Sequence, residues 1–345
     1  MARLPLELER VVFEGAAVTT RECIPQLLLV ARRVKIWIEP LLHESLVVLD
    51  HGVADKHVFP RAAHLRSAAI STLSTERRSF LGRHVRSICI VLACGPEPLV
   101  TALLPDLHHL TTLFVYPFPS HTRLLPSFLS SGAHAVMPAL TRLEVDITTL
   151  WDAQDGQVTQ ISHHPHNFSH LTHLCLHDCN GEATLAWNRA TREFPTADTN
   201  QIHLIASLPA LTHLAFDDGS IPLQPCYVLL ERCPRLLVLV LRSTVNKRDA
   251  QLRQLVYFHL AALPTGNGGF ADGDIRFVML LNFGRQMNRR INCWLDEEPQ
   301  SDRRQCDFWA VAEEFVARRK EIYARDPTDA RDWLIDWSEF ETRSG

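Results

Sequence analysis

The sequence predicts an α/β fold in which short parallel strands alternate with helices and stack as successive repeats. Two observations lead to this prediction: a six-residue apolar pattern recurs along the middle of the chain, and helix-like stretches separate its copies. With 345 residues, of which 46% are hydrophobic and 21% charged, the chain can bury a large core. An ordinary doubly wound α/β domain is the alternative, because its strands are equally apolar.

The recurring pattern is L-x-x-L-x-[apolar], and its copies begin at Val85, Leu110, Leu140, Leu171, Leu211 and Leu236. The copy that runs from Leu171 to Cys179 has the full form L-x-x-L-x-L-x-x-C, which is the pattern of a leucine-rich repeat. Alternate residues of a strand face opposite sides, so the leucines are expected to point into the core and the residues between them outward. Three of the copies also share a Leu-Thr start, at Leu140, Leu171 and Leu211.

The spacing of the copies is uneven, which predicts a short irregular solenoid with inserts, at Trp151 to Asn167 and at Glu182 to Asn200. Helix-like stretches lie at 123–129, 201–207 and 228–232, and strands that alternate with helices imply parallel pairing. We expect three parts: an N-terminal helical module in residues 1–50, the repeat domain in 51–285, and a C-terminal helical cap and tail in 286–345.

The N-terminal part predicts two helical stretches. The first has an early proline and apolar residues at helical spacing, from Leu4 to Phe13. The second runs from Ile24 to Leu42, where Pro25 is expected to interrupt the helix and Pro40 to end or kink it. A capping element for the repeats is one interpretation of these helices, since open arrays need capped ends.

The same residues resemble an F-box. Leu4 to Phe13 fits the opening L-P-x-E-L-x-x-x-[IV]-F, and Val30 to Val34 and Pro40 to His43 look like later parts of the motif. The resemblance implies docking to the Skp-type adaptor of a cullin-RING ubiquitin ligase, through Leu4, Pro5, Leu8, Val12, Phe13, Leu28, Val30, Val34 and Trp37. The whole chain is also similar to fungal F-box-like leucine-rich proteins, on these residues together with 208–214 and 307–315.

The C-terminal part predicts a strand from Ile275 to Leu281 and an amphipathic helix from Asp307 to Ala324. The apolar stripe of this helix consists of Trp309, Ala312, Phe315 and Val316. The basic run 318–320 comes late in the helix, where cations suit the helix dipole, and we expect it on a solvated face. The helix is therefore interpreted as a cap.

The outward positions of the repeat strands predict the binding surface, because in a solenoid they line the concave face. A mixed aromatic, charged and histidine surface suits a protein target, and the residues expected to contact it are Thr112, Phe114, Tyr116, Arg142, Glu144, Asp146, His173, His177, His213, Asp217 and Arg242. Aromatic residues and arginine dominate binding hot spots, which favours Phe114, Tyr116 and Arg142 as anchors. The alternative is that the inserts cover some of these positions.

Eighteen histidines raise the question of a metal. His173, Cys175 and His177 share the outward side of one strand, and His213 and Asp217 lie alongside if the two strands are neighbours. Alternate residues on a strand stand about 6.6 Å apart, which is wide for one ion. We therefore predict no metal and no cofactor, and a polar face that responds to pH near 6 to 7.

Composition and motifs favour a non-enzymatic protein-interaction scaffold. The formal net charge of −4 gives no reason to expect nucleic acid, and no apolar run reaches membrane-spanning length. Nine scattered cysteines without a C-x-x-C pair or a visible secretory leader suggest reduced thiols, in the cytoplasm or nucleus. No nucleophile motif such as G-x-S-x-G is present. We expect an F-box-type substrate receptor; a plain scaffold without adaptor docking and a hydrolase-like α/β enzyme are the alternatives.

Overall fold

The computed structural model describes residues 4–20, 23–49, 62–92, 103–117, 138–146, 152–154, 157–159, 168–177, 202, 205–217, 223–242, 274–281, 308–325 and 334–336. Over these residues the protein is an α/β structure of parallel strands and helices, as the sequence predicts. The chain divides into two compact units, Met1–Leu140 and Thr141–Gly345. The predicted inserts and the first helix-like stretch fall largely outside the described residues.

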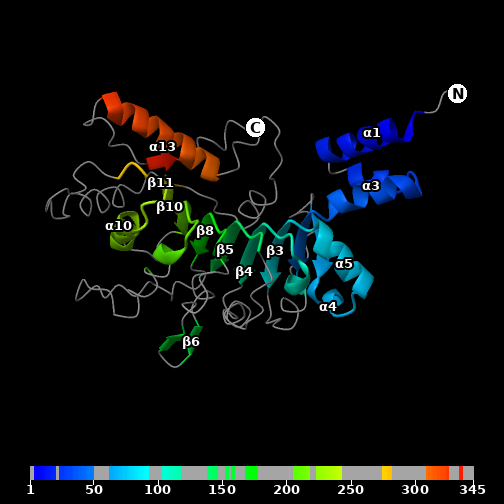
Figure 1. The fold of residues 1–345 in the computed structure, drawn as a ribbon, viewed down its shortest axis with the longest axis horizontal. Coiled ribbons are helices and arrows are strands. Elements are labelled where there is room, and N and C mark those ends of the chain that lie inside the picture. Colours follow the sequence, from blue (N-terminus) through cyan, green and yellow to red (C-terminus); the bar gives the residue numbers. More distant parts are fainter. Residues whose placement is uncertain are drawn as a thin grey trace. The chain divides into compact units, whose positions relative to one another are not determined.

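The first unit begins with helices and continues as a parallel sheet (Figure 1). Its strands follow the order β2-β1-β3-β4, and each neighbouring pair is parallel. Its elements are α1 (Leu6–Thr19), α2 (Ile24–Leu27), α3 (Arg32–Leu42), β1 (Ser45–Leu49), β2 (Ala63–Arg66), α4 (Ser67–Ile70), α5 (Thr75–His84), β3 (Ser87–Leu92), the 3-10 turn η2 (Leu104–Asp106) and β4 (Thr112–Pro117).

The second unit holds a parallel sheet in the order β12-β11-β10-β9-β8-β5 and a separate antiparallel hairpin, β6-β7. Its elements are β5 (Arg142–Asp146), β6 (Asp152–Gln154), β7 (Gln157–Thr159), β8 (His173–His177), β9 (His213–Asp217), α10 (Leu223–Arg232), β10 (Val238–Arg242), β11 (Phe277–Leu281), α13 (Phe308–Arg325) and β12 (Leu334–Asp336). The hairpin lies within the first predicted insert.

Each predicted copy of the repeat becomes a strand that begins two residues after the first residue of the pattern. The first residues are all buried, with exposed fractions of 0–3%: Val85, Leu110, Leu140, Leu171, Leu211 and Leu236. The inward positions of the strands are buried as well, for example Leu174 and Leu176 of β8. The predicted inward and outward register is therefore correct in these strands. β1 and β2, which do not carry the pattern, were missed.

The Leu-Thr start of the repeats has a structural cause. In the second unit the backbone oxygen of Thr141 accepts hydrogen bonds from the N–H groups of Thr172 and His173, and the oxygen of Thr172 accepts from Thr212 and His213. The threonine hydroxyls reinforce this ladder, because Thr172 Oγ1 donates to the oxygen of Thr141 (3.1 Å) and Thr212 Oγ1 to that of Thr172 (3.2 Å). Threonine at this position thus fixes the register between successive repeats.

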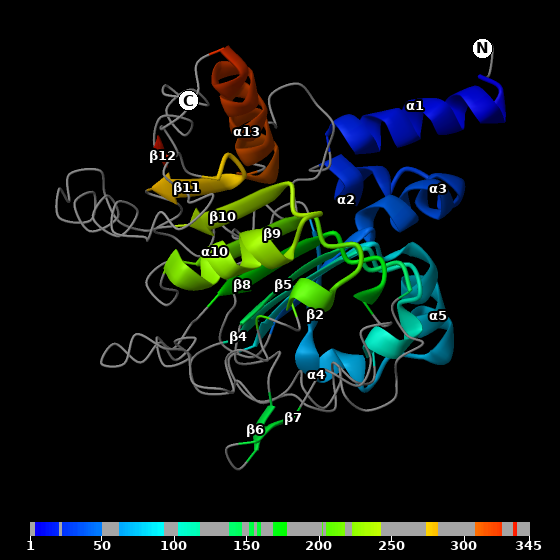
Figure 2. The ribbon, with the colours of Figure 1, turned by 60° about the vertical axis from the view of Figure 1, so that its left-hand side comes forward.

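Helix α13 packs on the outward side of the second sheet. Its buried Phe308, Trp309 and Ala312 form one apolar cluster with outward residues of four strands: Cys175, Ala215, Val238, Val240, Val278 and Leu280. Figure 2 shows α13 and α10 on different sides of β9 and β10. The predicted stripe of Trp309, Ala312, Phe315 and Val316 is the packing face of the helix, so this prediction is confirmed.

Two predicted details are wrong. Pro25 does not interrupt a helix, because it occupies the first turn of α2, where a proline needs no N–H partner. The break comes later, at Ala31, whose extended backbone precedes α3, and Pro40 lies inside α3. In α13 the basic run is not wholly solvated: Arg319 is 3% exposed, and its Nη1 donates to the backbone oxygens of Phe277 (2.8 Å) and Ile275 (3.2 Å).

The described cysteines are free thiols: Cys23, Cys89, Cys175, Cys226 and Cys233. Four of them are buried, and burial raises the pKa of the Cys226 thiol to about 12, which keeps it protonated. They behave as small apolar core residues. Among the helices that the structure describes, none combines the length and the apolar character that crossing a membrane requires.

Candidate functional site

The N-terminal helical module, residues 4–42, has its own small core. Ala17 of α1, Ile24 of α2, and Val34 and Ile38 of α3 are at most 1% exposed and pack together. Phe13, Leu28 and Trp37 pack against this core as partly buried side chains. The apolar face of α1 that includes Phe13 and Ala17 is therefore used to hold the module together.

A second apolar face of α1 is left exposed. Leu8 is 53%, Val11 65%, Val12 60% and Val18 43% exposed, and their spacing puts them on one side of the helix. Leu29 and Val30, which lie between α2 and α3, are 86% and 58% exposed. Large apolar side chains that gather in this way mark a surface for association.

The residues expected to contact an adaptor fall into three groups. Leu4, Pro5, Leu8, Val12 and Val30 are exposed, and Phe13, Leu28 and Trp37 are partly buried. Val34 is fully buried in the module core, so it supports the surface and does not reach a partner. Five of the nine residues are thus freely accessible, and four of these belong to α1 or the residues before it.

An arginine fastens α3 to α5. Nη1 of Arg77 donates to the carboxylate Oε1 of Glu39 (2.9 Å), and Nη2 lies 2.6 Å from Nε2 of His43. Nδ1 of His43 lies 2.9 Å from the backbone oxygen of Glu39. The guanidinium also stacks on the ring of Phe80 at 4.7 Å. Burial lowers the pKa of His43, and the charge of Arg77 acts in the same direction, so the folded protein holds a neutral imidazole there.

We expect this histidine to make the first unit less stable in acid. Because the folded pKa of His43 lies below its ordinary value of 6.5, the unfolded chain takes up a proton that the folded protein rejects once the pH falls below about 6.5. Urea unfolding of His43→Gln at pH 7.5, 6.5 and 5.5 should show a smaller loss of stability than wild type. His108→Gln, at an exposed position of the same unit, is the control; equal pH slopes for wild type and His43→Gln would refute the assignment.

The predicted target-binding residues are less accessible than the sequence suggests. Arg142 and His173 are partly exposed, whereas the others whose side chains are described are buried: Thr112, Phe114, Glu144, His213 and Arg242. For Tyr116, Asp146, His177 and Asp217 the structure describes only their strand positions. In the second unit α13 covers this face, since its apolar side occupies the outward positions of β8 to β11.

Glu144 and Arg242 form a buried ion pair on this covered face. Nη2 of Arg242 lies 2.9 Å from Oε1 of Glu144, and the two side chains are 1% and 2% exposed. The guanidinium also lies over the ring of Phe308 of α13, 4.9 Å from its centre. The two charges that the sequence assigns to target binding are therefore engaged with each other.

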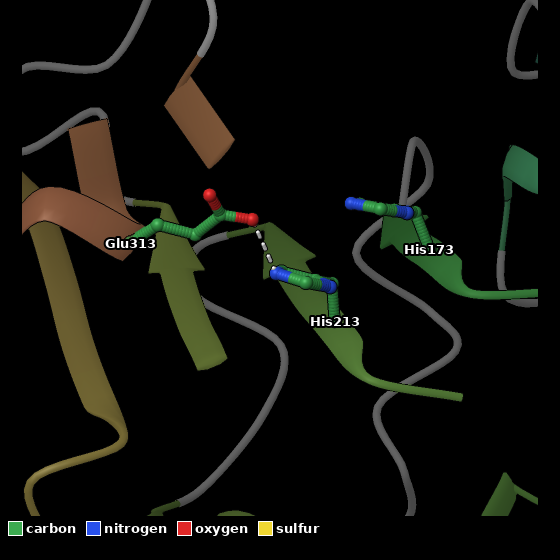
Figure 3. Close-up of side chains that lie close together, drawn as sticks. All are labelled: His173, His213 and Glu313. Atoms are coloured by element: carbon green, nitrogen blue, oxygen red, sulfur yellow. Dashed lines mark ion pairs between the residues drawn. The ribbon is translucent and has the colours of Figure 1, made fainter. Parts of the chain in front are cut away.

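Three further side chains converge at the edge of the same face (Figure 3): His173 of β8, His213 of β9 and Glu313 of α13. The two histidines are register partners in the parallel pair, and their rings stack with centres 4.1 Å apart. Nε2 of His213 lies 2.7 Å from Oε1 of Glu313. One nitrogen or oxygen atom from each of the three lies within 4.8 Å of the other two.

Trp309 of α13 packs against this group. Its ring meets the rings of His173 and His213 edge to face, at 5.3 and 5.5 Å. Burial lowers the pKa of His173 to about 3, and the neighbouring His213 and Arg142 contribute to this shift. His173 is therefore a neutral imidazole at neutral pH, which is the form that can donate a lone pair.

The threonines of the repeat starts set the proton positions on both rings. Thr172 Oγ1 lies 2.8 Å from Nδ1 of His173, and Thr212 Oγ1 lies 2.8 Å from Nδ1 of His213. Each hydroxyl already donates its proton to a backbone oxygen, so it can only accept from the ring. Nδ1 therefore carries the proton, and in a neutral ring Nε2 presents its lone pair toward the other members of the group.

Sequence reasoning identified the two histidines and missed Glu313. It placed His213 alongside, but its distance argument used alternate residues of one strand. The structure brings together register partners on two neighbouring strands, which are closer. The available signal was the spacing of α13: Glu313 follows Trp309 by four residues, on the edge of the predicted apolar stripe. Placing that stripe on the outward face of the repeats would have put Glu313 beside the strands.

Comparison with known proteins adds no family to these observations: no family model matches the chain, and no curated protein matches it.

Proposed function

We propose that this protein is a non-enzymatic substrate receptor whose N-terminal helical module docks a Skp-type adaptor and whose leucine-rich-repeat region binds a target protein. In this interpretation the module is a degenerate F-box, and the parallel strands belong to a short irregular repeat solenoid. The observation that carries the proposal is the exposed apolar face of α1, which begins with the Leu-Pro-x-Glu-Leu sequence of residues 4–8.

The distribution of exposed apolar side chains supports a docking role. Among the described residues, nine of the ten large apolar side chains that are exposed lie between Leu4 and Ile36, and the tenth is Leu237. A helix that only capped the repeats would need to bury one apolar face, and α1 already does so through Phe13 and Ala17. The second face is left for a partner, and an apolar groove of the adaptor is the partner that the F-box resemblance implies.

The recurring strand starts support the repeat interpretation. At these starts one backbone oxygen accepts two N–H groups, from the residue just before the next strand and from the first residue of that strand. Arg86 does so for Thr111 and Thr112, and Thr172 for Thr212 and His213. A contact that recurs at the same pattern position is typical of stacked repeats, where each unit meets its neighbours in the same way.

The burial of the outward face limits where a target protein can bind. Arg142 and His173 are the predicted contact residues whose described side chains stay partly exposed, and they are register partners on β5 and β8. A target would meet these two residues directly. It would reach Glu144, His213 and Arg242 only after α13 had moved away from the sheet, because α13 packs over that part of the face.

A pull-down with purified Skp-type adaptor tests the docking proposal. Leu8→Asp/Val12→Asp puts two charges on the exposed face without touching the module core, and we expect adaptor binding to fall by about 30-fold or more, as for a hot spot of ~2 kcal/mol. Leu237→Asp is the matched control, since Leu237 is similarly exposed, at 50%, outside the module. Failure of the wild-type chain to bind the adaptor would reject docking and leave the plain scaffold.

A further inference from the structure

The group formed by His173, His213 and Glu313 has an unusual electrostatic arrangement. With the proton of each ring on Nδ1, the lone pair of a neutral Nε2 of His213 faces a carboxylate oxygen at 2.7 Å. Two acceptors at that distance repel each other unless a proton or a cation lies between them. A proton would join His213 to Glu313 alone, whereas a metal ion could be bound by His173, His213 and Glu313 together.

We propose that His173, His213 and Glu313 bind a divalent transition-metal ion, with Zn²⁺ as the natural occupant. Two imidazole nitrogens and one carboxylate oxygen are a ligand set that zinc uses, with bonds of about 2.0–2.2 Å and a fourth position open to water. Tetrahedral bonds of that length put ligand atoms about 3.3 Å apart. The three atoms lie within 4.8 Å of one another, so small side-chain rotations close the site.

The residues around these three side chains have the features of protein metal sites. A ligating histidine usually donates its second N–H to an oxygen that fixes the ring, and here Thr172 and Thr212 each supply such an oxygen. Trp309 provides an apolar wall against both rings. Glu313 is 52% exposed, so the ion has a route from solvent.

Zinc bound in this place ties α13 to β8 and β9. Glu313 lies on α13, whereas His213 and His173 lie on neighbouring strands and precede it by 100 and 140 residues in the sequence. The ion thus adds a polar link at the edge of the apolar contact made by Trp309 and Ala312. We expect bound zinc to hold α13 over the outward face, and we expect removal of zinc to loosen the packing of the helix.

Calorimetric titration of the chelator-stripped full chain with ZnCl₂ tests the proposal. We expect one site of micromolar or tighter affinity in wild type, and its loss or a weakening of at least about tenfold in Glu313→Gln. The chain holds 18 histidines, so the result is the difference between wild type and variant and not the total zinc bound. Glu313 is exposed enough for the variant to fold, which circular dichroism checks.

Two more variants make the test specific. Glu314→Gln changes the adjacent exposed acid of α13, which is not part of the group, and should bind zinc like wild type. Thr212→Val keeps the side-chain shape but removes the hydroxyl beside Nδ1 of His213, and should weaken binding by about 10- to 100-fold. The proposal is overturned if wild type binds no zinc at micromolar concentration, or if Glu313→Gln and Glu314→Gln bind it equally.

Discussion

Removing either charge of the buried Glu144–Arg242 pair is expected to lower the free energy of unfolding by about 3–5 kcal/mol. The pair is closed at 2.9 Å, and neither side chain is more than 2% exposed. In Glu144→Leu the guanidinium of Arg242 stays buried beside Phe308 and loses the carboxylate that lies 2.9 Å away. Urea unfolding followed by tryptophan fluorescence and circular dichroism measures the loss.

The double variant separates the cost of an unpaired charge from the value of the pair. Glu144→Leu/Arg242→Met removes both charges of the pair, so we expect it to recover most of the stability that Glu144→Leu loses. The pair Arg10–Glu14 in α1 is the matched control, because its contact is similarly short, at 2.7 Å, but its side chains are 57% and 33% exposed. Breaking that pair should cost about 0.5 kcal/mol or less. A similar cost at both pairs would contradict the prediction.

This ion pair also shows what the sequence could predict and what it could not. The period-two pattern correctly placed Glu144 and Arg242 on the outward side of their strands. It could not reveal that a helix covers that side, because the covering residues begin at Phe308, far along the chain. Strand periodicity assigns a side chain to a face of a sheet, whereas the occupant of that face depends on long-range packing that local patterns do not encode.

The repeat starts were predictable for the opposite reason. Leu171 and Leu211 are buried and Thr172 and Thr212 bond to the preceding strand, so each position meets the same local surroundings in successive units. Positions with the same surroundings favour the same residues, so the sequence pattern recurs. Glu313 occurs once and contacts strands that are distant in sequence, so no repetition marks it, and the group with His173 and His213 emerges only from the three-dimensional arrangement.

The second large effect is expected at Trp309, which is 3% exposed and lies at the centre of the contact between α13 and the sheet. Trp309→Ala removes a large buried side chain, and such truncations cost about 3–5 kcal/mol because the cavity closes only in part. The ring touches His173, His213 and Phe308, so its loss weakens the contacts of α13 with β8 and β9 at once.

We expect this cost to appear as local opening of α13, because the helix is held mainly by one face and by Arg319, while the strands keep their ladder of hydrogen bonds. Hydrogen exchange of Trp309→Ala, measured with a chelator present, should therefore quicken in residues 308–325 and stay unchanged in β1 and β3. Phe315→Ala, at a partly buried position of the same helix, should have a smaller effect. Uniformly faster exchange in both units would mean that α13 is a part of the cooperative core; exchange confined to α13 would mean that the outward face, with Glu144, His213 and Arg242, can be uncovered while the sheet remains folded.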